Sequence, residues 1–488
     1  MPDPLRDDAP LLAAYLDRLD AGDAPFTIPG HKRRASRLDA GLGRCVDVDV
    51  PMYGGLGTIK SAAAVVADAE RRAAALWGAD HARFTTGGST HANQAVCLAL
   101  GRPGQRVVLT RAAHRSTLTG LVLAGLEPVW VNPGIDPATG IPTGLDPGDV
   151  ARALREYDDV CAVVTVDPGY LGALADLPAL ATVAHEAGVP LVVDQAWAAH
   201  LGFHPDLPPH ALQADADVLV TSVHKVLPGY SAAAVVLART DRIDADRLDR
   251  GVDAGLTTSP PGAPLASIDG VRALLADRGA TLLAGVLPLV ARARESLRAV
   301  PGVVVPGPED LQAGRFDPMK LVVLTAGCGA DGVAVERDLL DRGVPVEMAD
   351  RDTIVPIVTV ADDEASVTRL VDSLVDSLTR RSGPPRPVAA QLAWTVRPHP
   401  VVPLREAFFA DRVAVPAGDA VGRVSAELVA PYPPGVPVLA PGELVTAEVV
   451  AGLRDLVAHG TRVAYAADPT VATLRVLRSE PPRSEVPA

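Results

Sequence analysis

Apolar positions follow two alternating spacings between about residues 60 and 240. Segments with apolar residues on one helical face are separated by short runs of mostly β-branched residues. The predicted helices are SAAAVVADAERRAAALWG (61–78), LTGLVLAGL (118–126), DPGDVARALREY (146–157, starting at Asp146 or Pro147) and LPALATVAHEAG (177–188). The predicted strands are RVVLT (106–110), PVWVN (128–132), CAVVTVDP (161–168), VPLVVDQAW (189–197), ADVLVTSVHK (216–225) and SAAAVVLAR (231–239). This alternation predicts an α/β fold with a mostly parallel sheet and helices on both of its faces.

A second α/β pattern follows the first. It has long helical stretches over 265–300, a strand in KLVVLTAG (320–327), a helix in DGVAVERDLLDRG (331–343) and a strand-like TIVPIVTV (353–360). A polar segment rich in Pro and Arg then reads as a linker. The predicted division is an N-terminal arm (1–58), a large domain (59–265), a smaller α/β domain (266–381), a linker (382–388) and a Pro-rich C-terminal α+β domain (389–488).

Composition narrows the classes of protein that fit this pattern. The 488 residues carry a net charge of −14, which disfavours binding to nucleic acid or to an anionic membrane. The four cysteines (Cys45, Cys97, Cys161 and Cys328) form no CxxC pair, so we expect buried free thiols and neither disulfides nor a zinc site. The acidic start lacks a signal-peptide pattern, and no apolar run reaches the roughly 18 residues of a membrane span. We therefore expect a soluble, cytoplasmic protein.

Polar and ionisable residues follow several of the apolar runs directly. In a parallel sheet, ligands bind at the carboxyl ends of the strands, which is where these residues lie. Asp194 ends a fully apolar run, so its carboxylate needs a cationic or hydrogen-bonding partner. Ser222, His224 and Lys225 end the next predicted strand, and only four of the 45 basic residues are lysines. An aspartate and a lysine on neighbouring strands match the pyridine-nitrogen partner and the Schiff-base lysine of pyridoxal-phosphate enzymes. The alternative for Asp194 is a structural helix cap.

Two further segments add candidate ligands. TTGGSTHANQAV (85–96) places Gly88, Ser89 and Thr90 immediately before or at the start of a helix, where backbone N–H groups and hydroxyls can bind phosphate. An ordinary loop and helix cap would look the same. His114 follows the strand RVVLT, where its ring could stack on an aromatic cofactor or simply start a helix.

Taken together, these segments resemble the Orn/Lys/Arg decarboxylase family of fold type I pyridoxal-phosphate enzymes. The resemblance also rests on PGHKRR (29–34), TTSPPGAPLASID (257–269), PLREAFF (403–409) and AVGRVSAELVAPYPPGVPVLAPGE (420–443), all in the family's order. The chain resembles the short form of the family, without an N-terminal regulatory domain. The last of these segments separates this family from generic aminotransferases.

The resemblance implies pyridoxal 5'-phosphate as the cofactor and assigns its ligands by position. Lys225 looks like the Schiff-base lysine, Asp194 the partner of the pyridine nitrogen, His114 the stacking histidine and His224 the histidine before the lysine. The remaining matches are Gly88, Ser89, Thr90 and Ser222 at phosphate positions, Ala196 under the ring, and Thr258 and Ser259 toward the phosphate of the partner subunit in a homodimer. No metal is implied.

The sequence departs from the family at two places. The turn TTGGST differs from the NGTS-like version, and Trp197 stands where many short members carry a histidine. Candidates for binding the distal cation of the substrate are Glu347, Asp350 and Glu406, which could equally be ordinary surface or structural acids.

The expected activity is decarboxylation of a basic L-amino acid to an amine and CO2. Arginine is the first candidate substrate, before lysine or ornithine. The enzyme is expected to act in polyamine biosynthesis. The alternatives are another fold type I enzyme, such as an aminotransferase or an aldolase-like lyase, and a regulatory homologue without catalysis. Whether His224 or Lys225 reprotonates the product carbon is open at this point.

Overall fold

The computed structural model describes residues 7–21, 32, 46, 48–50, 64–311, 314–388, 392–432 and 435–479. The chain divides into two compact units. The first comprises residues 1–99 and 192–284, and the second comprises residues 100–191 and 285–488. The PGHKRR segment apart from Lys32, together with Cys45 and Lys60, lies outside the described residues. The predicted domain boundaries remain a prediction.

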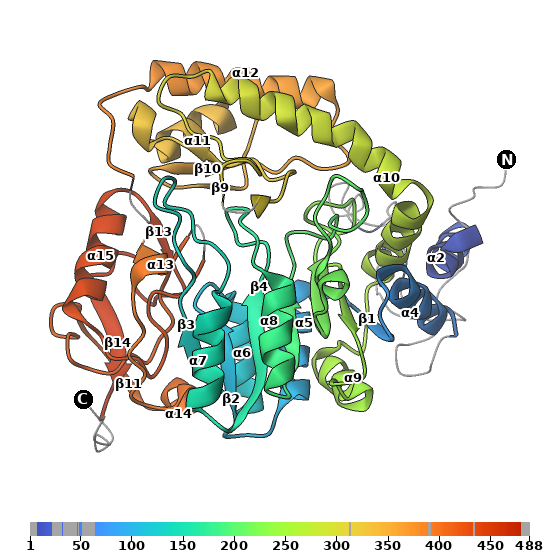
Figure 1. Cartoon of the computed structure of the whole chain (residues 1–488), viewed down its shortest axis with the longest axis horizontal. Helices are drawn as coiled ribbons and strands as arrows, with labels where there is room; N and C mark the ends of the chain where they lie inside the picture. The colour runs from blue at the N-terminus through green and yellow to red at the C-terminus, as the bar shows by residue number, and fades with distance from the viewer. Residues whose placement is uncertain are drawn as a thin grey trace. The chain divides into compact units, whose positions relative to one another are not determined.

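The main sheet has seven strands in the order β1-β7-β6-β5-β4-β2-β3 (Figure 1). The pairs β2·β3, β2·β4 and β5·β6 are parallel, whereas β1·β7 and β6·β7 are antiparallel. Every residue of β5, β6 and β7 is buried, as strands covered on both faces require. The predicted mostly parallel α/β sheet is confirmed. The strands are β1 (His81–Thr85), β2 (Arg106–Thr110), β3 (Glu127–Val131), β4 (Val160–Val166), β5 (Leu191–Asp194), β6 (Val218–Ser222) and β7 (Ala234–Ala238).

Two of the helices between these strands have an end that the sequence marks with a capping residue. The Asp146 side chain accepts from the Asp149 N–H, so α7 begins at Pro147 as predicted. Gly125, at a φ of 72°, ends α6. Figure 1 shows α7 and α8 side by side over β2, β3 and β4. The helices of this region are α4 (Ala64–Trp77), α5 (Gly88–Leu100), α6 (Arg115–Ala124), α7 (Pro147–Glu156), α8 (Leu177–Glu186) and α9 (Ala245–Gly255).

The predicted second α/β region forms a small sheet with helices. The long helix α10 (Gly262–Arg298) has a kink at Arg278, whose φ is −143°. A three-stranded antiparallel sheet has the order β8-β10-β9, and its strand β8 spans two residues of the longer run that the sequence predicts. The other elements here are β8 (Val323–Leu324), α11 (Gly332–Asp341), β9 (Met348–Ala349), β10 (Thr353–Val355) and α12 (Glu364–Arg380).

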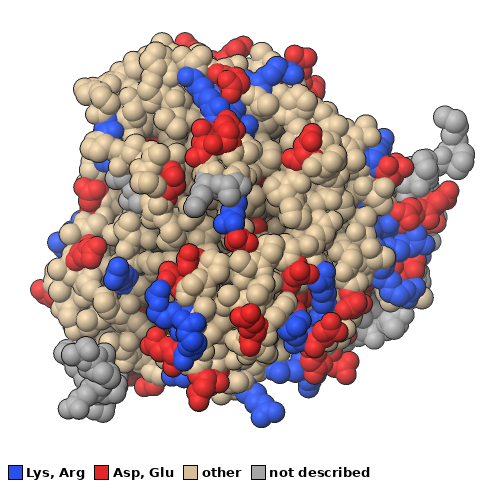
Figure 2. All heavy atoms as spheres, in the orientation of Figure 1, with Lys and Arg blue, Asp and Glu red and all other residues tan. Residues whose placement is uncertain are grey.

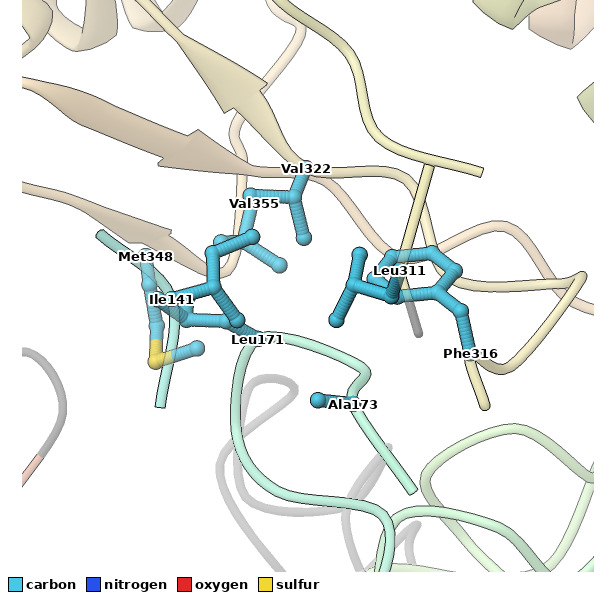
Figure 3. Close-up of a cluster of buried hydrophobic side chains, with 8 residues drawn as sticks. All are labelled: Ile141, Leu171, Ala173, Leu311, Phe316, Val322, Met348 and Val355. Carbon is cyan, nitrogen blue, oxygen red and sulfur yellow. The ribbon is translucent and has the colours of Figure 1, made fainter. Parts of the chain in front are cut away.

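A buried apolar cluster joins this small sheet to the loops that follow β3 and β4, all within the second unit (Figure 3). Phe316 and Val322 are completely buried in it, and Phe316 forms a β-bridge with Ala173. The rest of the cluster is Ile141, Leu171, Ala173, Leu311, Met348 and Val355. Burial of this size stabilises the second unit as one packed body.

The C-terminal residues form two short antiparallel sheets, β11·β14 and β12·β13, with three helices. The small cluster around Ala407 and Leu477 is their local core. The predicted α+β character of this region is confirmed. Its elements are α13 (Leu392–Thr395), α14 (Leu404–Phe409), β11 (Arg412–Pro416), β12 (Ala430–Tyr432), α15 (Ala447–Ala458), β13 (Arg462–Ala464) and β14 (Thr473–Leu477).

On the face of the molecule in Figure 2, acidic and basic side chains are interspersed. Of the described cysteines, Cys97 and Cys328 are buried as predicted, but Cys161 is only partly buried because it lies near the start of its strand.

Among the described helices, α10 alone is long and apolar enough to cross a membrane by length and composition. That is weak support for a span, because the core helix of a soluble protein meets the same criterion.

Candidate active site

Asp194 and Lys225 follow two neighbouring parallel strands. Asp194 is the last residue of β5 and pairs in register with Val220 of β6. Lys225 comes three residues after β6 ends at Ser222. Parallel strands end at the same edge of a sheet, so the predicted pair lies at the edge where α/β proteins bind ligands.

The Asp194 carboxylate is held in place by hydrogen bonds on both of its oxygens. Asp194 is 4% exposed. Oδ2 accepts from Asn93 Nδ2 at 2.6 Å, and Oδ1 accepts from the Ala196 N–H at 3.1 Å. Each carboxylate oxygen has two acceptor positions, so these bonds leave capacity for a further donor such as a pyridinium N–H.

Helix α5 begins beside the end of β6 and provides a place for a phosphate. Gly88 opens the helix with a φ of 66°, and its N–H donates to Ala232 O at 2.7 Å. Ser89 Oγ lies 2.7 Å from Ser222 Oγ, and both side chains are buried. The hydroxyl pair stands at the start of a 13-residue helix, whose free N–H groups and dipole favour an anion. Thr90, the third predicted phosphate ligand of this turn, is exposed.

Asn93 is a functional candidate that the sequence interpretation missed. It lies four residues after Ser89, so the two side chains share one face of α5. Ser89 therefore contacts Ser222 at the end of β6, and Asn93 donates a hydrogen bond to Asp194 at the end of β5. The four-residue spacing within GGSTHANQ was the available signal.

Lys225 and His224 have contacts that the sequence did not predict. The Lys225 ammonium lies 4.1 Å from the centroid of the Trp197 ring, a cation–π distance. His224 Nδ1 lies 2.8 Å from the Ala233 carbonyl oxygen, so Nδ1 carries the hydrogen because a carbonyl only accepts. Burial, together with the charge of Lys225, lowers the pKa of His224, so the neutral ring with an unprotonated Nε2 is favoured near pH 7.

His114 belongs to the second unit and occupies the N-cap of α6. Its Nδ1 lies 2.7 Å from Ser116 Oγ and 3.3 Å from the Ser116 N–H. The ring is therefore fixed from one side by the first turn of the helix. The structure confirms the helix start at His114, and the stacking role stays a prediction.

Other predicted residues lie apart from these contacts. Thr258 and Ser259 are exposed in the loop between α9 and α10, and the described contacts do not join them to Ser89 or Ser222. Among the candidates for the substrate's distal cation, Glu347 and Glu406 are exposed. Asp350 is buried, accepts from the Asp352 N–H at 2.8 Å, and has a pKa that burial raises to about 6.

The first unit thus offers the donors that pyridoxal phosphate requires. These are a buried carboxylate with spare acceptor capacity, a hydroxyl pair at a helix N-terminus and a lysine after the neighbouring strand. The residues fit this cofactor, and with the sheet they define the class: a fold type I pyridoxal-phosphate enzyme.

Comparison with known proteins identifies the family within that class. Residues 9–366 match the Orn/Lys/Arg decarboxylase major domain, and residues 396–460 match the C-terminal domain of the same family. The chain is 30% identical to the arginine decarboxylase of Bacillus subtilis (strain 168), over 97% of this chain and 98% of that protein. It therefore belongs to the Orn/Lys/Arg decarboxylase family, and it is an amino-acid decarboxylase, a carboxy-lyase.

Solved structures support the fold assignment. The lysine decarboxylase A of Pseudomonas aeruginosa superposes with a TM-score of 0.80 at 19% identity, over 96% of this chain and 80% of that chain. The Francisella novicida lysine decarboxylase LdcF gives 0.79 at 18% identity, with the same coverage. A Sphingomonas wittichii serine palmitoyltransferase gives 0.55 at 16% identity over 77% of this chain and 85% of that chain. At these identities the similarity shows the fold alone.

Proposed function

We propose that this chain decarboxylates L-arginine, with L-lysine and L-ornithine as the alternative substrates, and that it acts in the cytoplasm in polyamine biosynthesis. The choice of arginine is supported by the near full-length similarity to the Bacillus subtilis arginine decarboxylase. The lysine decarboxylase LdcA of Pseudomonas aeruginosa is 23% identical over 80% of this chain and 66% of that protein.

One observation supports the proposed reaction most strongly. Asp194 and Lys225 follow neighbouring strands, and the Ser89–Ser222 hydroxyl pair lies beside them. Pyridoxal phosphate, when bound, supplies an electron sink for the electron pair left by the departing carboxylate. Asp194 would hold a proton at the pyridine nitrogen and so keep that sink positively charged. Ser89 and Ser222, with the N-terminus of α5, would bind the phosphate, and Lys225 would bind the cofactor covalently.

The proton returned to the product carbon comes from Lys225 in our proposal. His224 is held as the Nδ1–H tautomer by Ala233, and its lowered pKa favours the neutral ring. A neutral ring with an unprotonated Nε2 accepts a proton more readily than it gives one. The Lys225 ammonium, over the Trp197 ring, is the better donor.

Product analysis tests the proposed activity. The purified protein, loaded with pyridoxal phosphate, is incubated separately with arginine, lysine and ornithine, and CO2 and the amine product are measured. We expect CO2 and amine in equal amounts, fastest with arginine, and none from Lys225→Ala. Transfer of the amino group to an added keto acid would instead identify an aminotransferase. No reaction with any of the three would favour a regulatory homologue.

A further inference from the structure

Helix α5 contacts the Asp194 carboxylate through one buried side chain. Asn93 and Asp194 are 5% and 4% exposed, and Asn93 Nδ2 lies 2.6 Å from Asp194 Oδ2. An ionised carboxylate only accepts hydrogen bonds, so the amide must turn its NH2 group toward it. Both residues belong to the first unit, so the contact lies within one compact body.

The other donor to Asp194 comes from the backbone just after it. The Ala196 N–H donates to Oδ1 at 3.1 Å. With that bond alone, the carboxylate could still rotate about one of its oxygens. The Asn93 bond to the second oxygen removes this freedom, and hydrogen bonds to ionised groups are of the stronger kind. Asn93 therefore ties the orientation of Asp194 to another element of the fold.

Ser89 and Asn93 place two parts of the site on one face of α5. They are four positions apart in a continuous helix, a rise of about 6 Å. Ser89 Oγ lies 2.7 Å from Ser222 Oγ, at the position proposed for the phosphate. Asn93 bonds the carboxylate proposed for the ring nitrogen. One helix therefore sets the spacing between the residues for these two groups of the cofactor.

The opposite face of α5 packs against α9. His91 lies on that face, and its Nε2 donates to Val252 O at 2.9 Å, because a carbonyl only accepts. A Cβ on Gly251 of α9 would lie 2.4 Å from Ala95 O, so the two helices approach each other closely. Helix α5 is thus held between α9 and the ends of β5 and β6, and it cannot turn without breaking contacts on both faces.

We propose that Asn93 is a positioning residue that orients the Asp194 carboxylate toward the ring nitrogen of pyridoxal phosphate. The helix that binds the phosphate then also sets the group that meets the nitrogen. This inference rests on the proposed function, because the cofactor role of Asp194 belongs to it.

A ligand that differs from pyridoxal phosphate at one ring position tests this role. In its 1-deaza analogue a C–H group replaces the ring nitrogen, and the aldehyde and the phosphate stay. The cofactor-free protein is titrated with each ligand, and the readout is the dissociation constant of the analogue divided by that of pyridoxal phosphate. This ratio isolates the contribution of the nitrogen, because every other contact is common to both ligands.

Asn93→Leu removes the donor and keeps the branched shape of the side chain. We expect it to weaken the binding of pyridoxal phosphate about tenfold, the scale of one hydrogen bond to a charged group. Binding of the analogue should change by less than about twofold, so the ratio should fall close to tenfold. A merely structural role would weaken the binding of both ligands alike and leave the ratio unchanged.

His91→Leu is the matched control. His91 is another buried polar residue of α5, and its substitution also leaves a buried acceptor, Val252 O, without this donor. Burial lowers the pKa of His91, so the ring is neutral near pH 7 and the substitution removes no charge. None of its described contacts involves Asp194. We expect a lower melting temperature and an unchanged ratio.

Asn93→Ser covers the case in which Asn93→Leu does not fold. Serine is small and polar, and its hydroxyl ends one bond short of the Asn93 amide nitrogen, so it does not reach Asp194 Oδ2. We expect this variant to fold and to show the same fall in the ratio.

Asp194→Ala separates failure of this inference from failure of the proposed function. If Asp194→Ala keeps the wild-type ratio, Asp194 does not meet the ring nitrogen, and both its proposed role and the inference are wrong. If the ratio falls in Asp194→Ala but not in the folded Asn93 variants, the role of Asp194 stands and only the inference is wrong. An equal fall in His91→Leu would also overturn the inference, because any disturbance of α5 would then be sufficient.

Discussion

At the scale of single residues, the proposed chemistry depends most on Lys225. It is one of four lysines in the chain, and it stands three residues after a fully buried strand. We predict that reduction of the cofactor-loaded protein with borohydride, followed by peptide mapping, places the pyridoxyl group on Lys225. A label on Lys32, Lys60 or Lys320 would contradict the assignment, and Lys225→Ala is the negative control.

The role that we propose for Asp194 can be tested separately from that of Lys225. Its carboxylate can keep the pyridine nitrogen protonated, whereas an asparagine amide cannot. We predict that Asp194→Asn still binds pyridoxal phosphate, through the α5 phosphate site, but loses activity on the order of 100-fold, the size typical for a lost charge-stabilising group. The measurements are cofactor titration and initial rates on the same preparation. Near-normal turnover in a folded variant would show that Asp194 is only structural.

At the scale of elements, a charged cluster connects α4, β1 and α9 in the first unit. Glu70 of α4 accepts from the Phe84 N–H of β1 at 2.9 Å and lies 3.4 Å from Arg83 Nε. Arg83 and His81 in turn bond Asp249 of α9, each at 2.7 Å, and Arg83 Nη2 bonds Asp253 at 2.9 Å. These contacts fix the strand that leads into the Gly88 turn.

The cluster predicts a specific pH dependence of stability. Burial raises the pKa of Glu70 to about 7, from an ordinary value of 4.5, against the opposing effects of Arg83 and the Phe84 N–H. The folded state therefore binds this proton more tightly, so the contribution to stability is complete below pH 4.5 and is lost as the pH rises to about 7. We predict that Glu70→Gln loses less stability than the wild type between pH 5 and pH 8, by roughly 2–3 kcal/mol. Melting curves at both pH values measure it, with the exposed Glu295→Gln as control, and parallel losses in Glu70→Gln and the wild type would contradict it.

Prediction from sequence succeeded for elements with a strong local pattern. The strands before Asp194 and Lys225 are continuous β-branched runs, and α7 has both an N-cap and a proline at its first position. Strand β1 was missed because HARFT is short, has no β-branched residue before its last position and pairs only with β7, at the end of the sheet. Strand β1 is buried because it packs against α4 and α9, and the residues of the strand themselves do not indicate this packing.

Hydrogen bonds between residues far apart in the sequence were not predicted from local patterns. Asn93 bonds Asp194, which is 101 positions away, and Arg111 bonds Glu443, which is 332 positions away. Both pairs depend on how the chain returns on itself. The spacing of Ser89 and Asn93 shows that they share a helix face, but it does not show that Asn93 bonds Asp194. The sequence interpretation could therefore propose candidate reacting groups, but it did not name the residues that contact them in the structure.

At the scale of the whole molecule, we propose that the active unit is a homodimer with shared sites. Thr258 and Ser259 resemble residues that reach the phosphate of the partner subunit, and in the single chain both are exposed. A pair of exposed hydroxyl residues in the loop before α10 fits a role outside their own subunit. Sedimentation should show a dimer, and an active monomer would contradict the proposal.

Complementation tests the shared site directly. Lys225→Ala lacks the lysine, and Thr258→Arg with Ser259→Arg blocks the phosphate side contributed to the partner, so each protein alone should be nearly inactive. In a heterodimer, one of the two sites combines the intact lysine of one subunit with the intact hydroxyls of the other. Random pairing of equal amounts makes half of the dimers mixed, each with one working site, so activity should return to about a quarter of the wild-type value per subunit. Heterodimers isolated with two different affinity tags should then show half the wild-type activity. If isolated heterodimers stay inactive, Thr258 and Ser259 serve only their own subunit and the shared-site proposal is wrong.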